Sequence, residues 1–412
     1  MPTTAQREFA LEVVQKLRAA GCEALWAGGC VRDQLLGIEP KDYDVATSAR
    51  PDDIRNLFGH KRTLAIGASF GVITVLGRRP QGQIEVATFR TDAAYSDGRH
   101  PDSVEFTTAE HDAERRDFTI NGLFFDPVAG KVVDYVGGRD DLARQLIRAI
   151  GEPRLRLSED KLRMLRAVRF AATFGFAIEP ATLAAIQEMA PEVTTVSAER
   201  IGAEIRRMLV DPNRAVALDL LRETNLLPQV LPEVAQLDAA DWSDTRRVLA
   251  NLQDPTLAVA IAALLHVADS QAPSAVGRRL RYTNREIERT NWLLAHLEII
   301  RRAPSVFWPR LQRVLVHDGA EELVALYEAV AGCDDAALAF VRERLAWPVH
   351  QLNPPPLIDG SDLIHHGLSP SPDFARLLEA VRDAQLCGEI ETSAGAMSLV
   401  ERLLAGDSDP GP

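Results

Sequence analysis

Two carboxylates stand one residue apart in the stretch KDYDVAT, at Asp42 and Asp44. Side chains alternate along a β-strand, so both would point the same way, about 7 Å apart. Like charges this close repel each other unless a cation lies between them. Their hard oxygen atoms suit Mg²⁺, which takes its remaining ligands from water and substrate phosphates. Glu85 in QIEVATFR could reach the same face from a neighbouring strand, as in a two-metal phosphoryl-transfer site, although an isolated D-x-D pair more often marks a solvated surface.

A pair of glycines, Gly28 and Gly29, precedes these carboxylates in WAGGCVRD. Adjacent glycines let backbone N–H groups approach a phosphate closely, and a helix beginning near Val31 would add partial positive charge. Arg32 could offer a guanidinium fork to a triphosphate, with Asp33 holding that arginine or the helix start. Alone, a glycine pair before a helix indicates little. Joined to the D-x-D pair, it predicts a nucleoside triphosphate site.

Two later stretches could contact other parts of a nucleotide. In ERRDFTINGL, Asp117 could accept a hydrogen bond from a ribose hydroxyl and Arg116 could contact phosphate or base; the alternative is an Arg–Asp pair that caps a turn. In SEDKLRMLRAVRF, Asp160 and Arg163 lie three apart on an expected helix and so share a face. By spacing alone, an ordinary surface ion pair is the simpler interpretation.

The hydrophobic pattern predicts the elements that hold these residues. Residues 5–20 have apolar positions at helical spacing, and from there to about residue 136 short β-type runs are broken by Gly and Pro. This predicts an α/β domain on a mixed sheet. After Gly138 the patterns are helical to about residue 350, and a proline run at 353–356 precedes a last helical segment. The fold class is therefore α+β, a small mixed-sheet head followed by helices.

Charge is unevenly distributed along the chain. The 412 residues carry a net charge of −13, whereas nucleic-acid binding usually leaves a basic footprint. Residues 139–169, however, contain nine Arg or Lys against five Asp or Glu, a local balance of +4. A basic region within an acidic protein favours one specific polyanion over indiscriminate binding.

The cysteines and the apolar runs limit the class of protein. Cys22, Cys30, Cys333 and Cys387 have no C-x-x-C spacing, which argues against a zinc site or a disulfide framework. No apolar run reaches the roughly 18 residues of a membrane helix, and the first residues lack the apolar core of a signal peptide. We expect a cytoplasmic protein with no membrane partner.

Together, GGCVRDQLLG and KDYDVAT resemble the signature of polymerase-beta-type nucleotidyltransferases, specifically the family of class II CCA-adding tRNA nucleotidyltransferases and bacterial poly(A) polymerases. The resemblance extends through ERRDFTINGL, VGGRDDL and SEDKLRMLRAVRF, and continues in SAERIGAEIRRML and, more weakly, from residue 359 to 390. It implies a Mg²⁺-dependent enzyme that adds CMP and AMP from CTP and ATP to the 3′ end of tRNA without a template. Asp42 and Asp44 would hold the metal, with Glu85 as a third catalytic carboxylate.

The same resemblance implies the domain organisation and the source of base choice. A nucleotidyltransferase head (1–138) would precede an all-α neck (139–210), an RNA-binding body (211–350) and a tail (351–412) with a disordered C-terminus. Asp160 and Arg163 would imitate the Watson–Crick edge of a partner base, while Arg166 and Arg169 could reach the triphosphate or the RNA. Glu199, Arg200 and Glu204 would be structural. The expected nucleotide-binding residues are Gly28, Gly29, Arg32, Asp33, Arg116, Asp117, Asp160, Arg163, Arg166 and Arg169.

Three activities share these motifs: CCA addition, addition of A alone, and poly(A) tailing. The polar stretch 91–111 resembles the flexible loop that enzymes limited to CC addition tend to lack. The chain ends in acid and proline instead of the basic extension common in poly(A) polymerases, which favours tRNA over general RNA. Addition of A alone stays open.

A catalytically inactive RNA-binding protein is disfavoured because all three carboxylates are present. The oligomeric state does not follow from the sequence. Gly137 and Gly138 form either a hinge or an ordinary loop.

Overall fold

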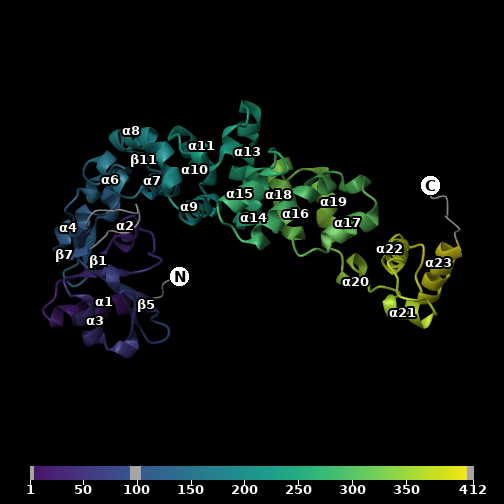
Figure 1. The fold of residues 1–412 in the computed structure, drawn as a ribbon, viewed down its shortest axis with the longest axis horizontal. Coiled ribbons are helices and arrows are strands. Elements are labelled where there is room, and N and C mark those ends of the chain that lie inside the picture. The colour runs from purple at the N-terminus through teal and green to yellow at the C-terminus, as the bar shows by residue number, and fades with distance from the viewer. Residues whose placement is uncertain (1–3, 93–103, 406–412) are drawn as a thin grey trace. The chain divides into compact units, whose positions relative to one another are not determined.

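The computed structural model describes residues 4–92 and 104–405 (Figure 1). It divides into two compact units, Met1–Trp242 with Arg278–Arg281 and Ser243–Gly277 with Tyr282–Pro412. Most of the predicted flexible loop (93–103 of 91–111) and the predicted disordered end (406–412) lie outside the described residues. No helix in the described ranges is long and apolar enough to cross a membrane.

The first unit is built on a seven-stranded mixed sheet with the order β3-β4-β5-β2-β1-β8-β9. Strands β2 and β5 run parallel, with Asp44 opposite Glu85, and the other neighbouring strands in this sheet are antiparallel. The strands are β1 Ala24–Ala27, β2 Asp44–Thr47, β3 Thr63–Gly67, β4 Val72–Leu76, β5 Gln83–Thr88, β8 Phe124–Asp126 and β9 Lys131–Val133. The expected mixed-sheet head is confirmed. Asp42, however, precedes β2 and does not lie in the strand as the alternation argument assumed.

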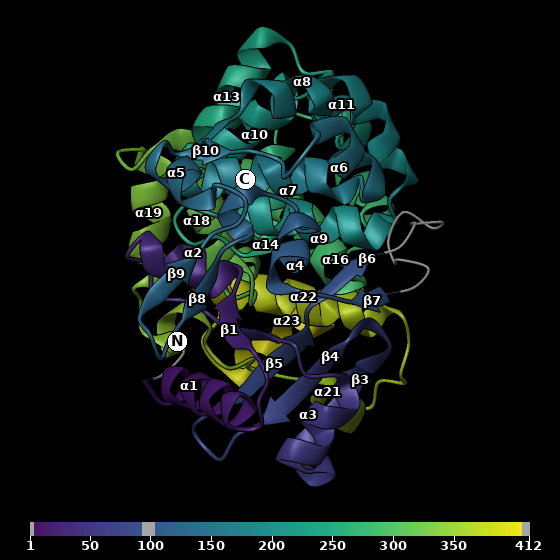
Figure 2. The ribbon, with the colours of Figure 1, turned by 90° about the vertical axis from the view of Figure 1, so that its left-hand side faces the viewer.

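Two helices cover one face of this sheet, α1 (Thr4–Ala19) and α3 (Pro51–Phe58), which lie below the strands in the view of Figure 2. The alternate strand residues that face them are fully buried, namely Val45, Ile73, Val75, Ile84 and Val86. Because strand side chains alternate, Asp44, Glu85 and Thr74 point to the opposite face. The buried face thus fixes the register that sets two of the predicted carboxylates side by side.

Shorter elements complete the head and lead into helices. They are α2 Gly29–Leu35, β6 Arg90–Asp92, β7 Val104–Phe106, α4 Ala109–Glu114, a 3₁₀ turn at Thr119–Asn121 and α5 Gly138–Ala143. The helical part of the first unit contains α6 Pro153–Glu159, α7 Leu162–Phe174, α8 Pro180–Met189, α9 Ala198–Val210, α10 Arg214–Glu223, α11 Leu227–Val230 and α12 Pro232–Ala235. Helix α7 packs against α9 and α10. Two short strands, β10 (Leu146–Ile147) and β11 (Ala177–Ile178), also pair here, although strands were expected to stop at Gly138.

The helix expected to carry both Asp160 and Arg163 is broken at Asp160. Helix α6 ends at Glu159, Asp160 has an extended backbone (φ −144°, ψ 102°), and α7 begins at Leu162. The Asp160 carboxylate accepts the backbone N–H of Leu162 at 3.1 Å and so caps the start of α7. The prediction of one shared helical face was therefore wrong, because the aspartate satisfies a free helix N–H instead of continuing the helix.

The second unit is helical, which confirms the expected all-α remainder. Its helices are α13 Ala239–Asn251, α14 Leu257–Leu264, α15 Ala272–Arg279, α16 Asn284–Arg301, α17 Trp308–Leu315, α18 Ala320–Ala331, α19 Ala336–Leu345, α20 Val349–Leu352, α21 Gly360–His365, α22 Asp373–Leu386 and α23 Ser393–Ala405. Helices α13 and α15 each have residues in both units. The last three helices share a small apolar core of their own around Leu363, Leu377 and Val400. The division into head, neck, body and tail stays a prediction.

Candidate active site

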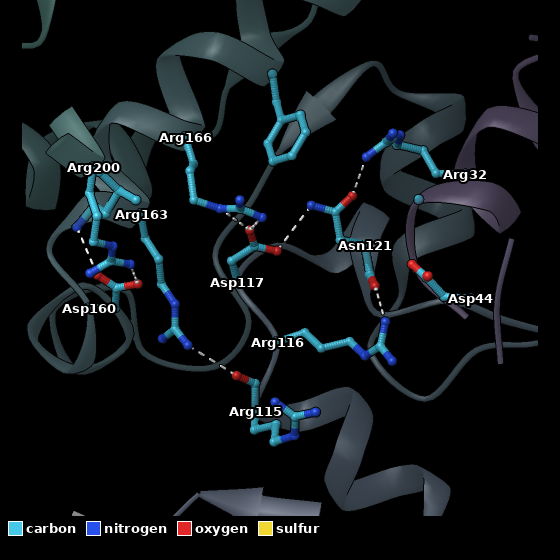
Figure 3. A pocket seen from close by; sticks show the side chains of 14 residues that line it. Arg32, Asp44, Arg115, Arg116, Asp117, Asn121, Asp160, Arg163, Arg166 and Arg200 are labelled. Carbon is cyan, nitrogen blue, oxygen red and sulfur yellow. Dashed lines mark hydrogen bonds and ion pairs between the residues drawn. The ribbon is translucent and has the colours of Figure 1, made fainter. Parts of the chain in front are cut away.

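A cavity of about 530 Å³ lies within the first unit, between the sheet and helix α7 (Figure 3). It brings together nine of the thirteen predicted site residues. Its lining consists of Gly28, Gly29, Arg32, Asp44, Arg115, Arg116, Asp117, Asn121, Asp160, Leu162, Arg163, Arg166, Phe170 and Arg200. The large excess of arginine over carboxylate in this lining suits an anionic ligand such as a triphosphate.

The turn between β1 and α2 requires glycine at position 28. Gly28 has a positive φ of 70°, and a Cβ atom there would lie 2.8 Å from a guanidinium nitrogen of Arg116. Backbone and guanidinium therefore approach each other at this wall as only glycine allows. The predicted phosphate-binding turn lies in the cavity wall with a cation beside it.

Arg32 is held rigidly by its neighbours. Its guanidinium donates to Asp33 Oδ1 at 2.6 and 2.8 Å, which is the partner expected from the sequence, and to Asn121 Oδ1 at 2.5 Å. It also lies over the rings of Phe174 and Phe170, 4.6 and 5.2 Å from their centroids. The side chain of Asn121 links Arg32 to the next acid in the cavity.

That acid, Asp117, has all its acceptor sites occupied. Oδ2 accepts two N–H groups of Arg166 at 2.6 and 2.8 Å, and Oδ1 accepts from Asn121 Nδ2 at 3.0 Å and from the Phe118 backbone at 2.8 Å. Burial by itself would raise the pKa of Asp117, but the charge of Arg166 and these hydrogen bonds outweigh it and hold the pKa well below the usual range. A ribose hydroxyl could bond to Asp117 only by displacing one of these donors.

Asp160 and Arg163 both line the cavity, but each is held by a different partner. Arg200 donates to Asp160 Oδ2 at 2.7 Å. Arg163 donates to Glu159, to the Arg156 carbonyl at 2.7 Å and to a second carbonyl, as Figure 3 shows in part. The sequence identified Arg200 only as a structural residue of SAERIG, and nothing in its spacing indicated a contact with Asp160.

Asp44 carries the electrostatic feature expected of a metal ligand. It is accessible from the cavity, but the surrounding protein removes part of its hydration, and this is the main reason why its pKa is raised to about 6. The neighbouring Glu85 carboxylate raises it further, Arg116 lowers it, and Asp42 raises it slightly. A divalent cation would relieve the repulsion that Glu85 and Asp42 exert on Asp44, and carboxylate oxygens are the donors that such a cation prefers. Among residues 4–92 and 104–405, no group of three or more His, Cys, Asp or Glu has the geometry of a complete metal site.

Four predicted residues lie outside the cavity lining, namely Asp33, Asp42, Glu85 and Arg169. Glu85 is beside Asp44 on the next strand. Arg169 forms an ion pair with Glu204 at 2.6 Å and lies 4.1 Å from the centroid of the Phe170 ring, so it braces the wall. Sequence reasoning missed Arg115 and Leu162 as lining residues, because nothing distinguishes them from other helix-end residues.

Comparison with known proteins identifies the family of this chain. Sequence profiles match residues 24–148 as a poly A polymerase head domain and residues 175–237 as a probable RNA and SrmB-binding site of polymerase A. The CCA-adding enzyme of Enterococcus faecalis is 44% identical over 225 residues and that of Geobacillus stearothermophilus 42% over 235 residues. These alignments span only 54% and 57% of the two relatives. The CCA-adding enzyme of Lacticaseibacillus paracasei is 33% identical over 382 residues, which cover 92% of both chains. The chain belongs to the CCA-adding enzyme family.

Solved structures of CCA-adding enzymes share the whole fold. A Bacillus stearothermophilus CCA-adding enzyme in complex with CTP superposes with a TM-score of 0.78 at 30% identity, covering 97% of this chain and 98% of the other. A Thermotoga maritima CCA-adding enzyme complexed with tRNA has a TM-score of 0.69 at 19% identity and shows a common fold only. Nucleotidyltransferases of the kind that includes the CCA-adding enzymes generally use a divalent metal ion.

Proposed function

We propose that this protein adds CMP and AMP from CTP and ATP to the 3′ end of tRNA without a template. One observation carries the proposal: a single cavity contains a glycine turn with arginines, a metal-type carboxylate and the Asp160–Arg163 pair. These would serve as a phosphate site, a reaction centre and a base site, and a template-independent nucleotidyltransferase needs all three. An inactive RNA-binding protein would not need to keep the unfavourable group of Asp42, Asp44 and Glu85.

The residues of the chain divide the work of phosphoryl transfer. Gly28, Gly29 and Arg32 would bind the triphosphate, and Arg116 and Arg166 would neutralise its charge. Asp42 and Asp44 would hold Mg²⁺, which when bound supplies charge neutralisation at the reacting phosphate and favours deprotonation of the attacking hydroxyl. Glu85 lies beside Asp44 and would orient the 3′-hydroxyl of the RNA toward the phosphorus.

Base choice would rest on Asp160 and Arg163. A carboxylate accepts from the exocyclic amine that cytosine and adenine share, and a guanidinium donates to the adjacent ring acceptor. Uracil and guanine present the opposite pattern at the corresponding positions, so neither side chain could form these hydrogen bonds with them. Because Arg200 and Glu159 already hold these two side chains, little conformational entropy would be lost when a base binds.

The experiment that tests the proposal uses the purified protein and three tRNA transcripts, ending at the discriminator base, at C or at CC. Sequencing of the products after incubation with Mg²⁺, CTP and ATP should show completion to CCA in every case. Growth only of the transcript ending in CC would mean addition of A alone, and a long A tract would mean poly(A) tailing. No extension of any transcript would refute the proposal. The expected place of action is the cytoplasm.

A further inference from the structure

A row of residues continues outward across the sheet from the reaction centre. Asp44 is opposite Glu85, Glu85 is opposite Thr74, and Thr74 is opposite Leu64. Residues opposite each other on neighbouring strands point to the same face, so this row lies on the face that α1 and α3 leave open. At about 4.8 Å between strands, the row reaches about 14 Å from Asp44 to the edge strand β3.

The outer part of this open face is apolar and accessible. Leu64 is 40% exposed and Ile66 is 89% exposed, and both belong to β3, which has no further neighbour in the sheet. Val72 and Leu76 on β4 point to the same side and are half-buried. Single exposed apolar side chains are common, but a group of them beside a reaction centre indicates a surface that is covered during function.

A basic rim borders this apolar surface at the end where β3 begins and β4 ends. Residues 54–84 contain five Arg or Lys and no Asp or Glu, in a protein whose net charge is −13. Lys61 and Arg62 precede β3, while Arg78 and Arg79 lie in the turn between β4 and β5, and all four are exposed. Arg62 donates to the Leu76 carbonyl at 3.2 and 3.3 Å, which joins the two halves of the rim. Within the described residues, neither Lys61 nor Arg78 forms an ion pair.

The geometry of in-line transfer decides which ligand fits this surface. The residues that would bind the incoming triphosphate lie on the β1 side of β2, because Gly28 follows β1 and Arg116 contacts Gly28. The attacking oxygen must approach the phosphorus opposite the leaving pyrophosphate. In the sheet order, the opposite side of β2 is the one with β5, β4 and β3.

We infer that the open surface formed by Leu64, Ile66, Val72 and Thr74, with the rim of Lys61, Arg62, Arg78 and Arg79, binds the RNA strand that leads to the 3′ end. The inference rests on the proposed function and adds the path of its RNA substrate. Sugars and bases would lie on the apolar residues and phosphates on the rim. An acidic peptide added to the edge of β3 would explain the charge, but not why the surface continues the row of Asp44 and Glu85.

Matched charge reversals test the rim. Lys61→Glu and Lys131→Glu make the same charge change at exposed lysines near opposite edges of the sheet, just before β3 and in β9. For Lys61→Glu we expect the slope of log Kd for tRNA against log salt concentration to fall by about 0.7, since that is the share of one lost single-strand phosphate contact. For the double variant Lys61→Glu/Arg78→Glu we expect that slope to fall by about 1.4 and the KM for tRNA to rise about tenfold. The KM for CTP should not change, and Lys131→Glu should resemble the wild type. A double variant with wild-type tRNA KM and salt dependence would overturn the inference.

A cross-link tests the apolar surface directly. Benzoylphenylalanine placed at Ile66, or at Val128 as a control, is irradiated with a tRNA transcript ending at the discriminator base; Val128 is 55% exposed in the turn between β8 and β9. Cross-links from position 66 alone to the 3′-terminal nucleotides would support the inference. Absence of RNA cross-links, or protein–protein cross-links showing that a second copy covers the surface, would overturn it.

The outcomes separate this inference from the proposed function. If the wild-type protein extends tRNA but all variants behave like it, the RNA path is wrong and the function stands. If the wild-type protein extends no tRNA but position 66 still cross-links to the RNA 3′ end, the surface stands and the function falls.

Discussion

Asp160 is bonded to Arg200, at 2.7 Å, and not to Arg163, its expected partner in base choice. Arg200 comes from α9, whereas Asp160 lies between α6 and α7, so the contact ties separate helices together at the base site. A carboxylate held in this way presents one fixed acceptor to an incoming base. If Asp160 selects the base as proposed, the precision of base choice would depend on a residue forty positions away in the chain.

Removal of Arg200 should loosen base choice. In Arg200→Ala the Asp160 carboxylate loses its anchor, and we expect kcat/KM for CTP to fall about 10- to 100-fold while discrimination against UTP falls by a similar factor. Competition between CTP and UTP for a tRNA ending at the discriminator base measures this. Arg207→Ala is the control, because Arg207 lies on the same helix, pairs with Glu204 and is not in the cavity lining. Unchanged CTP to UTP selectivity in Arg200→Ala would contradict the positioning role.

Asp44 should lower the free energy of unfolding at neutral pH, although we expect nucleotide addition to require its carboxylate. Its pKa in the folded protein is about 6, above the ordinary value, so ionisation at neutral pH costs folding free energy, and this cost disappears as the pH falls from 7 toward 4. Asp44→Asn should therefore abolish nucleotide addition and yet be more stable than the metal-free wild type at pH 7, by about 1 kcal/mol after allowance for solvent exposure. Thermal unfolding in EDTA at pH 7 and pH 5 measures the difference, which should shrink at pH 5.

Addition of Mg²⁺ provides the second half of that test. Because a cation that binds only the folded state stabilises it, Mg²⁺ should raise the Tm of the wild type more than that of Asp44→Asn. Asp42→Ala should behave in the same way, with activity lost and folding intact. Near-normal incorporation by either variant would refute the metal assignment.

Asp117 should contribute stability that acid removes. Its pKa is lowered in the folded state, so its ionised form stabilises the fold above about pH 4, the unfolded value, and this contribution is lost as the pH falls through the folded value. Asp117→Asn leaves Arg166 without its partner and should cost about 3 kcal/mol at pH 7. Urea unfolding of both proteins at pH 7 and near pH 3 measures this cost. If the difference in the free energy of unfolding between wild type and variant were no smaller at the lower pH, the ion pair of Asp117 with Arg166 would not be its source.

The sequence predicted which residues share the cavity better than it predicted their contacts. Asp44, Gly28 and Arg32 were expected in one site from their residue types and spacing, and all three line the cavity. Asn121 and Arg200 could not be predicted there, since their roles depend on contacts with Arg32 and Asp160, 89 and 40 residues away, and helix patterns do not specify such pairs. The break at Asp160 was also missed, although an aspartate before an apolar helical run is a recognised capping pattern.

Gly138 should be intolerant of substitution because it is packed and not because it is a hinge. A Cβ atom there would lie 2.2 Å from the Thr119 carbonyl oxygen, and the backbone N–H groups of Gly137, Gly138 and Arg139 all donate to Asp134. Gly138→Ala must push away the turn at Thr119–Asn121, so we expect a loss of about 3 kcal/mol, from overpacking, and a raised KM for both nucleotides through displaced Asn121.

Gly130→Ala is the matched control for that substitution. Gly130 lies in the same head with a positive φ of 66° and no atom within 4 Å of an added Cβ. The Gly130→Ala variant should therefore lose only about 1 kcal/mol of stability, through backbone strain, and its KM for nucleotides should not change. Urea unfolding and steady-state kinetics of the two variants distinguish the cases. If Gly138→Ala kept wild-type stability but lowered kcat alone, position 138 would act as a hinge, since a packed contact cannot be overfilled without a loss of stability.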